Sequence, residues 1–136
     1  MREILFRGKS IDNGEWIYSS FIMQDNEHKL LLSEIELFDG EKWRAVVPET
    51  VGEYTGLKDK NGTKIFEGDI CKTYFESYTH SWEEVGVVTE FCGAYGIESA
   101  DGKHFRAFIN ESVYTRSHEV IGNIHDNPEL LQEDKQ

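Results

Sequence analysis

Short apolar runs separated by Gly-containing turns extend over most of the chain. Apolar residues at alternate positions give a β-strand one hydrophobic face, and a polar or Gly-rich break every few residues ends it. Four such breaks are typical hairpin turns, because their residues tolerate positive φ: Asn13-Gly14, Asp39-Gly40, Asn61-Gly62 and Asp101-Gly102. The pattern predicts an all-β fold of short antiparallel strands and hairpins, which form a barrel-like or two-sheet core.

The length of each turn also predicts how its two strands pair. We expect a two-residue loop at Asn13-Gly14 and three-residue loops at the second and fourth turns, because these choices place apolar residues opposite one another. The predicted pairs are Phe6 with Phe21, Ile35 with Trp43, Leu57 with Ile65, and Ile97 with Phe105. For Leu30–Phe38 a helix remains an alternative to the strand, since Leu and Glu are good helix formers.

The chain is predicted to be a single domain, residues 1–136, with a possible subdivision near residue 48. Pro48 disfavours a central strand or a helix interior at that point. It would separate an N-terminal β-hairpin region (1–47) from a main β region (48–136). The main region is predicted to end in a short helix, in which Asn127 is the N-cap and Pro128 the first residue.

The composition narrows the class of protein. With 26 acidic and 14 basic residues the formal net charge is −12, which repels phosphate backbones, so we expect no direct nucleic-acid binding. Cys71 and Cys92 are too far apart for a zinc knuckle, and we interpret both as buried small apolar residues. No apolar run is long enough to span a bilayer, and the start lacks a signal peptide. We therefore expect no membrane association and a location in the cytoplasm.

The segment from Tyr54 to Ile70 contains two predicted sharp turns in close succession. Gly62 is expected to be left-handed after a type I turn that begins at Asp59. Gly68-Asp69 would then redirect the backbone. Glu67 and Asp69 could form a carboxylate pair, but the turn between them favours a structural role in which Asp69 accepts hydrogen bonds from nearby backbone N–H groups.

No group of residues in the sequence specifies a reaction. The five His and two Cys residues have no metal-ligand spacing, so no metal and no cofactor are expected. A Gly-x-Ser-x-Gly nucleophile motif and a phosphate-binding Gly loop are both missing from the sequence. The polar passage Glu76–Trp82 is the best candidate for an exposed loop, and its aromatic residues Tyr78 and Trp82 are candidate contacts for a protein partner.

Three parts of the sequence carry a family resemblance: Tyr54 to Ile70; Glu119 to Ile124 with Asn127 to Leu131; and Phe6-Arg7-Gly8 with Trp16-Ile17-Tyr18. In their order and spacing they closely resemble the YopX family of phage and prophage proteins. The resemblance implies a small, mostly β protein, and no catalytic or binding residue can be carried over from it. The shared positions form a candidate structural motif: Gly56, Gly62, Gly68, Asp69, Gly122 and Asn123.

These observations favour a non-enzymatic protein-interaction module that acts on a host or phage protein, as a monomer or as a homo-oligomer. Two alternatives stay open. One is an enzyme whose site is assembled only in three dimensions. The other is an acidic mimic of nucleic acid that occupies the groove of a DNA-binding protein.

Overall fold

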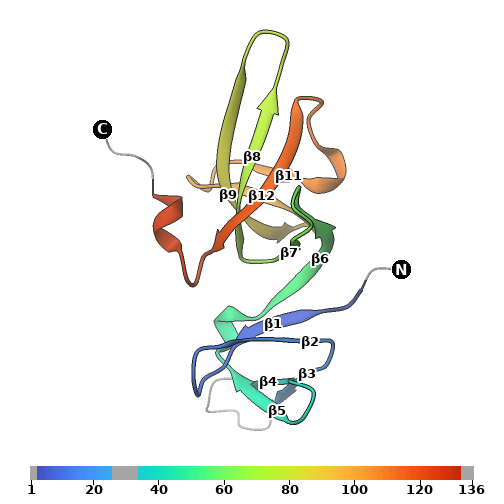
Figure 1. The fold of residues 1–136 in the computed structure, drawn as a ribbon, viewed down its shortest axis with the longest axis vertical. Helices are drawn as coiled ribbons and strands as arrows, with labels where there is room; N and C mark the ends of the chain where they lie inside the picture. The colour runs from blue at the N-terminus through green and yellow to red at the C-terminus, as the bar shows by residue number, and fades with distance from the viewer. Residues whose placement is uncertain (1–2, 26–33, 133–136) are drawn as a thin grey trace. The chain divides into compact units, whose positions relative to one another are not determined.

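The computed structural model describes residues 3–25 and 34–132. Of the segment Leu30–Phe38, only Glu34–Phe38 is described, and it is a strand and not a helix. The chain divides into two compact units, Met1–Gly56 and Leu57–Gln136. Figure 1 shows that both are built almost entirely of strands. Whether the chain is a single domain, and whether a subdivision lies near residue 48, stay predictions; the two units meet between residues 56 and 57.

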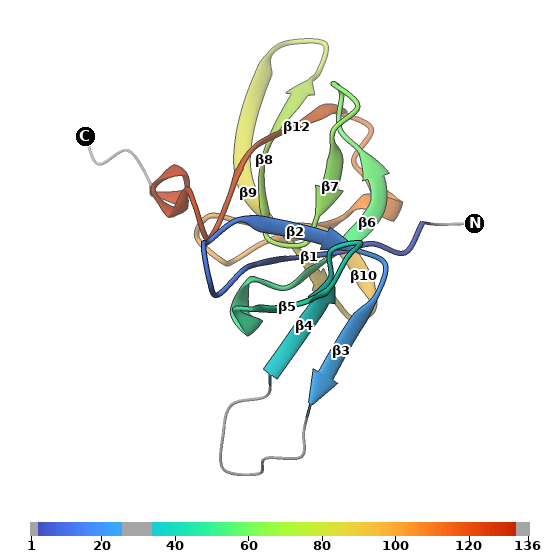
Figure 2. The ribbon, with the colours of Figure 1, turned by 60° about the horizontal axis from the view of Figure 1, so that its bottom comes forward.

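The first unit contains β1 (Phe6–Lys9), β2 (Trp16–Ser19), β3 (Ile22–Asp25), β4 (Glu34–Phe38), β5 (Trp43–Val46), the 3₁₀ turn η1 (Pro48–Thr50) and most of β6 (Gly52–Lys58). The strand β1 lies between β2 and β6, and β4 lies between β3 and β5 (Figure 2). The core of this unit consists of Ile17, Leu37 and Val46, with Phe6, Ile35 and Val51 packed against it.

The predicted pairing of the first hairpin is wrong. Phe6 pairs with Ser19, not with Phe21, and the strand β3 pairs with β4. The loop is longer than two residues, because the backbone N–H of Ser10 bonds Glu15 O at 2.8 Å and the Ser10 hydroxyl accepts a bond from Asp12 N. At the other end, the Ser19 hydroxyl bonds both N and O of Phe21, which turns the chain away from β1.

The second hairpin also differs from its prediction. Phe38, not Ile35, pairs with Trp43, and Ile35 pairs with Val46. The Asp39 carboxylate closes the turn, since its Oδ1 accepts hydrogen bonds from the backbone N–H groups of Glu41 and Lys42. The turn lies further toward the C-terminus than expected, since Asp39 N bonds Lys42 O and leaves Gly40 and Glu41 as the loop. In this register Leu37 is fully buried.

The second unit contains β7 (Lys64–Phe66), β8 (Asp69–Glu76), β9 (Ser81–Phe91), β10 (Ala94–Ser99), β11 (Phe105–Ala107), η2 (Phe108–Asn110), β12 (Thr115–Asn123) and η3 (Pro128–Leu131). Five of its strands form one antiparallel sheet in the order β11-β10-β9-β8-β12, and β7 pairs with β6. The long β8–β9 hairpin projects from this unit (Figure 1). Its core residues are Ile65, Cys71 and Val88.

The all-β class is confirmed, but two finer parts of the fold prediction are wrong. Within the described residues the strands form three antiparallel sheets, and none of them closes into a barrel. The predicted C-terminal helix is only the 3₁₀ turn η3. Asn127 does not cap it with its side chain; Asn127 Oδ1 instead accepts a hydrogen bond from Asn123 N at the end of β12.

The turns of the central segment have the predicted geometry. Gly62 has a φ of +83° and closes a turn that starts at Asp59, with Gly62 N bonded to Asp59 O at 3.0 Å. Gly68 has a φ of +94°, and Asp69 Oδ2 accepts a hydrogen bond from Phe66 N across that turn. The Asp59 carboxylate accepts bonds from three backbone N–H groups, including that of Val120 in β12.

Gly122 differs from the other glycines of the candidate motif, because its φ is not positive. A Cβ there would come within 2.6 Å of Asn127 Oδ1. Glycine fits this position because the Asn127 side chain lies so close to the backbone. Asn123 next to it organises the turn after β12, since its Oδ1 accepts hydrogen bonds from His125 N and Asp126 N.

Two further predictions need correction. Cys71 is buried, as expected, whereas Cys92 is exposed in the turn between β9 and β10. In the β10–β11 hairpin the register differs from the prediction by one residue, so Ile97 pairs with Arg106 and not with Phe105. The shift follows from a loop one residue longer than expected, since Ser99 N bonds His104 O. The shift exchanges the faces of the sheet for every side chain of β11.

Among the described residues, the structure contains no helix with the length and apolar character needed to cross a lipid bilayer.

Candidate functional site

The candidate site lies on one face of the sheet formed by β8, β9 and β12. Alternate residues of β8 point to the same face, and the register adds their cross-strand partners. Three successive rows result: Cys71 with Gly86 and Val120; Thr73 with Glu84 and His118; and Phe75 with Trp82 and Thr115. We name them the Cys71, Thr73 and Phe75 rows. They follow one another along β8 toward the tip of the β8–β9 hairpin.

The Cys71 row belongs to the hydrophobic core. Cys71 is fully buried, and Val120 packs against the same cluster. Gly86 is required here because a Cβ would come within 2.4 Å of Glu98 O on β10. Burial of the thiol, together with the nearby carboxylates of Asp69 and Asp59, raises the pKa of Cys71 to about 12. The thiol is therefore protonated near neutral pH and is a poor nucleophile.

The Thr73 row is polar, and its central contact is a chain of hydrogen bonds. Thr73 Oγ1 lies 2.8 Å from His118 Nδ1, and His118 Nε2 bonds Glu111 Oε1. In the neutral imidazole the Nε2–H donates to Glu111, so Nδ1 accepts the hydrogen of the Thr73 hydroxyl. The ring of Phe108 contacts His118 edge-on and limits its rotation. A hydroxyl, an imidazole and a carboxylate are thus connected in sequence.

A second polar contact in the same row is the ion pair of Arg106 with Glu84, in which Arg106 Nη2 lies 3.5 Å from Glu84 Oε1. The Arg106 guanidinium also lies over the ring of Phe75, with 5.0 Å between Cζ and the ring centroid. Arg106 reaches this position because β11 has the register described above. The register predicted from the sequence would place Phe105, not Arg106, opposite Ile97.

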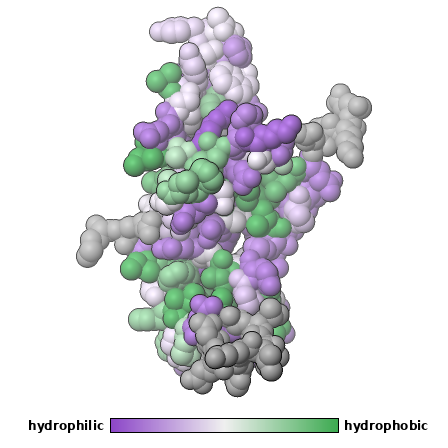
Figure 3. Space-filling model, turned by 180° about the vertical axis from the view of Figure 1, so that it is seen from behind, coloured by the Kyte–Doolittle hydropathy of each residue, from purple (hydrophilic) through white to green (hydrophobic). Residues whose placement is uncertain are grey.

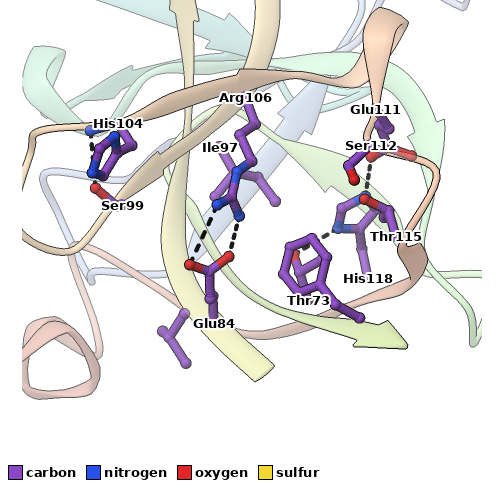
Figure 4. A pocket seen from close by; sticks show the side chains of 12 residues that line it. Thr73, Glu84, Ile97, Ser99, His104, Arg106, Glu111, Ser112, Thr115 and His118 are labelled. Carbon is purple, nitrogen blue, oxygen red and sulfur yellow. Dashed lines mark hydrogen bonds and ion pairs between the residues drawn. The ribbon is translucent and has the colours of Figure 1, made fainter. Parts of the chain in front are cut away.

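These side chains line a pocket with a cavity volume of about 50 Å³ (Figure 4). Phe75 and Ile97 are apolar lining residues, and the polar groups come from all five strands of the sheet, from the loop before β11 and from the segment before β12. Figure 4 shows the Arg106–Glu84 pair in the middle of the pocket, with Glu111, Ser112 and Thr115 grouped near His118. A β-bulge between Thr115 and Ser117 allows Thr115 and His118, three positions apart, to line the same pocket.

The Phe75 row begins an aromatic stack that extends toward the hairpin tip. The rings of Phe75 and Trp82 are parallel within 9° and their centroids are 5.2 Å apart. His80 stacks on Trp82 with 4.9 Å between centroids, and Tyr114 contacts Trp82 from the neighbouring segment. These contacts restrict the side-chain conformation of Trp82. The tip itself is Ser77–His80, where Tyr78 is fully exposed.

The stretch from η2 to the start of β12 presents further apolar side chains. A backbone hydrogen bond of 2.9 Å from Glu76 N to Tyr114 O ties it to the end of β8. Ile109 and Val113 are 81% and 80% exposed, and Tyr114 is 46% exposed. We name Tyr78, Ile109, Val113 and Tyr114 the contact surface. The hairpin tip is pale at the top of Figure 3, because Ser, Thr and Tyr have intermediate hydropathies.

The structure separates the residues that were predicted together. Tyr78 is exposed at the tip, whereas Trp82 is half-buried in β9 and not in the loop. Gly62, Gly68 and Asp69 form turns before β8, and Gly122 and Asn123 lie at the far end of β12, so this motif shapes the sheet and does not line the pocket. Among the described residues no three His, Cys, Asp or Glu side chains are gathered for a metal ion.

Sequence reasoning missed Thr73, Glu111 and His118. They are far apart in the sequence, and Glu111 is in a polar break that predicts only a loop. The usable signal was the pairing of β8 with β12, because it makes Thr73 and His118 cross-strand partners.

Comparison with known proteins adds a family assignment. No curated protein matches the chain. A solved structure, that of protein EF1440 from Enterococcus faecalis, matches 97% of this chain and 100% of its own with 24% sequence identity and a TM-score of 0.49. The family model described as YopX protein matches residues 5–132, which is nearly the whole chain. The chain therefore belongs to the YopX family.

Proposed function

We propose that this protein is a non-enzymatic interaction module that binds a basic host or phage protein through the contact surface of its second unit. The observation that carries the proposal is the exposure of Tyr78, Ile109, Val113 and Tyr114 on two segments tied together by a backbone hydrogen bond. Large apolar side chains that stay exposed in neighbouring segments are typical of protein contact sites. Tyr in particular is enriched among residues that dominate binding energy.

The surface is also organised before binding. Trp82 is fixed between Phe75 and His80, and Tyr114 rests against it. A partner would therefore meet rings whose rotamers are already restricted, which lowers the entropy cost of association. The side chains that would have to be immobilised are those of Tyr78, Ile109 and Val113, which are largely exposed.

Charge identifies the class of partner. The chain carries 26 acidic and 14 basic residues, so two copies would repel each other and a basic surface would be attracted. This argument favours a heterologous partner over a homo-oligomer. It also fits the absence of direct nucleic-acid binding that the composition predicts.

A nucleic-acid mimic is less well supported. A mimic needs unpaired carboxylates arranged like phosphates. On this sheet, Glu76, Glu83, Glu84 and Glu119 each lie within 4.0 Å of a basic partner: Arg116, Lys72, Arg106 and Lys60 respectively. Their charges are therefore partly compensated within the chain.

An enzyme is the second candidate, because the Thr73–His118–Glu111 chain has the order of a nucleophile, a base and an orienting acid. Two observations favour a structural role. Thr73 and His118 are direct cross-strand partners, and Thr73 is only 5% exposed. Its hydroxyl is therefore poorly placed to attack a substrate. Hydrolysis of a small activated ester that Thr73→Val abolishes and Thr73→Ser restores would make the enzyme the better account.

The module is tested by variant-dependent capture. The immobilised protein, Tyr78→Ala and Phe91→Ala are each exposed to lysate of a bacterial host, and bound proteins are quantified. Phe91 is the matched control, since it is a 61% exposed aromatic residue at the opposite end of β9. We expect a basic protein to be captured by wild type and by Phe91→Ala. The captured amount should fall about tenfold or more with Tyr78→Ala.

The purified captured protein is then titrated against all three forms. The same order of affinities would support the contact surface. Equal affinity for wild type and Tyr78→Ala would contradict it, and sedimentation that shows a dimer dependent on Tyr78 would replace the heterologous partner with a second copy of the chain.

A further inference from the structure

The pocket of the Thr73 row has hydrogen-bonding capacity that the chain does not use, and it is concentrated at one end. Within the described residues, Glu111 Oε2 and the Thr115 hydroxyl have no hydrogen-bond partner. The Ser112 hydroxyl accepts one bond, from Tyr114 N, and retains a second lone pair and its own hydrogen. Acceptor oxygens thus predominate at this end, so a ligand with several hydrogen-bond donors fits it.

The charges of the lining point to a cationic ligand. Glu84 and Glu111 are two carboxylates, whereas Arg106 is the one permanently charged cation among the lining residues. Arg106 is paired with Glu84. Among the described residues, Glu111 pairs with His118 and with no Lys or Arg side chain. A positive group beside Glu111 would neutralise the pocket.

The rest of the lining and the size of the cavity indicate the polarity and the length of the part of the ligand that carries the charged group. Ile97 is an apolar wall that suits a hydrocarbon chain, beside the ring of Phe75, which already contacts Arg106 and Trp82. One water needs about 10–15 Å³ on this measure of volume. The cavity of about 50 Å³ therefore takes a short chain of a few atoms and is too small for a nucleotide or an aromatic ring system.

We propose that the pocket binds an alkylammonium group, the side chain of a lysine that the basic partner inserts beside Glu111; this inference rests on the proposed function. An ammonium group has three donors on a compact head, which matches the carboxylate of Glu111 and the hydroxyl oxygens of Ser112 and Thr115. A guanidinium is planar and larger, and Arg106 already covers the ring of Phe75. The stem of the lysine packs along the apolar wall.

The position of the pocket supports this source of the amine. Phe75 both lines the pocket and stacks on Trp82, and Ser112 lies next to Val113 and Tyr114 of the contact surface. A partner seated on the contact surface would therefore have its adjacent side chains within reach of the pocket.

The test uses the protein alone, with Nα-acetyl-lysine N-methylamide as the probe and backbone amide signals in nuclear magnetic resonance as the readout. We expect saturable shifts at Glu111, Thr115 and His118 with a dissociation constant of about 1 mM. The analogue acetylated on Nζ keeps the stem and loses the charge, so it should bind at least about tenfold more weakly. Equal binding of both analogues, or no shifts at these residues, would overturn the proposal.

Two variants localise the effect. Glu111→Gln should weaken binding of the lysine probe about tenfold, while Glu83→Gln should change its dissociation constant less than about twofold. Glu83 is the control because it is an exposed carboxylate next to Glu84 in β9 and points to the other face of the sheet. Dispersed amide spectra of both variants show that they are folded. Equal loss in both variants would mean non-specific attraction to an acidic surface and would overturn the site.

The source of the amine is decided by 1,5-diaminopentane and by the captured partner. We expect the partner to lose affinity with Glu111→Gln and the diamine to bind no better than the lysine probe. Tighter binding of the diamine, with partner affinity unchanged in Glu111→Gln, would overturn the lysine assignment. Failure of the proposed function can be told apart from failure of the pocket assignment. The first is measured as the effect of Tyr78→Ala on affinity for the partner, and the second as the effect of Glu111→Gln on affinity for the lysine probe.

Discussion

The Cys71 row and the Thr73 row lie two residues apart on the same strands and the same face, yet they have opposite properties. The first combines a buried thiol, a glycine and a valine in a closed core. The second combines a hydroxyl, a carboxylate and an imidazole around a pocket. The backbone is the same extended ladder in both.

The comparison shows that side-chain chemistry alone separates a packed core from a polar pocket as the sheet extends toward the hairpin tip. The Cys71 row packs in the core of the unit, and the two rows nearer the hairpin tip carry the pocket and the aromatic stack that we propose for binding. Substitutions in the two regions should therefore separate stability from binding.

The largest loss of stability is expected from Ile65→Ala, which empties a site that is 1% exposed beside Cys71. Removal of a buried Ile side chain costs about 2–5 kcal/mol, because the lost contacts and the residual cavity both destabilise. Urea unfolding followed by tryptophan fluorescence measures the change. A loss below about 1 kcal/mol would mean that the Cys71 row is not a packed core.

Gly68→Val is expected to cost about 1–3 kcal/mol, since a β-branched residue is strained at a φ of +94°. This turn sets the start of β8 and hence the position of all three rows. Gly68→Ala is the milder companion, and thermal melting compares them. A melting temperature equal to that of wild type in the Val variant would show that the turn can relax without cost.

Thr73→Val should cost less, about 0.5–1.5 kcal/mol, because it keeps the shape of the side chain and removes one hydrogen bond to His118. The same urea titration used for Ile65→Ala provides the comparison. A loss as large as that of Ile65→Ala would place the Thr73 row in the structural core and remove the contrast between the two rows.

Tyr78→Ala should change the free energy of unfolding by less than about 0.5 kcal/mol, since the side chain is fully exposed and its ring contacts nothing that unfolding would release. It is nevertheless the substitution that should reduce partner binding most. Destabilisation above 1 kcal/mol would show that Tyr78 packs within the unit, in which case its effect on binding would be indirect.

The sequence was sufficient for the all-β class, the turns at Gly62 and Gly68 and the structural role of Asp69, because these depend on local rules of φ and side-chain capping. It was insufficient for three hairpin registers. In each case a side chain near the turn, such as Ser10 or Asp39, bonds backbone N–H groups, and the loop has a different length from the one predicted. Such bonds are not visible in the alternation of apolar residues.

The candidate site shows why a register error matters for function. The predicted pairing places Ile97 opposite Phe105, which are both apolar. It does not predict the Arg106–Glu84 contact, which forms only in the actual register. The Thr73–His118–Glu111 chain requires the long-range pairing of β8 with β12, which no local rule supplies. Only the exposure of Tyr78 could be predicted from its polar neighbours.

The most direct test of the account is residue-resolved amide exchange on the captured partner's complex with the full chain. We expect protection to increase at the β8–β9 hairpin tip, at residues 109–114 and around His118, and to stay unchanged at Phe91 and in the turn at Gly68. Protection centred on Phe91, or on the first unit, with no change at Tyr78 and Tyr114 would contradict the central claim that this end of the sheet binds the partner.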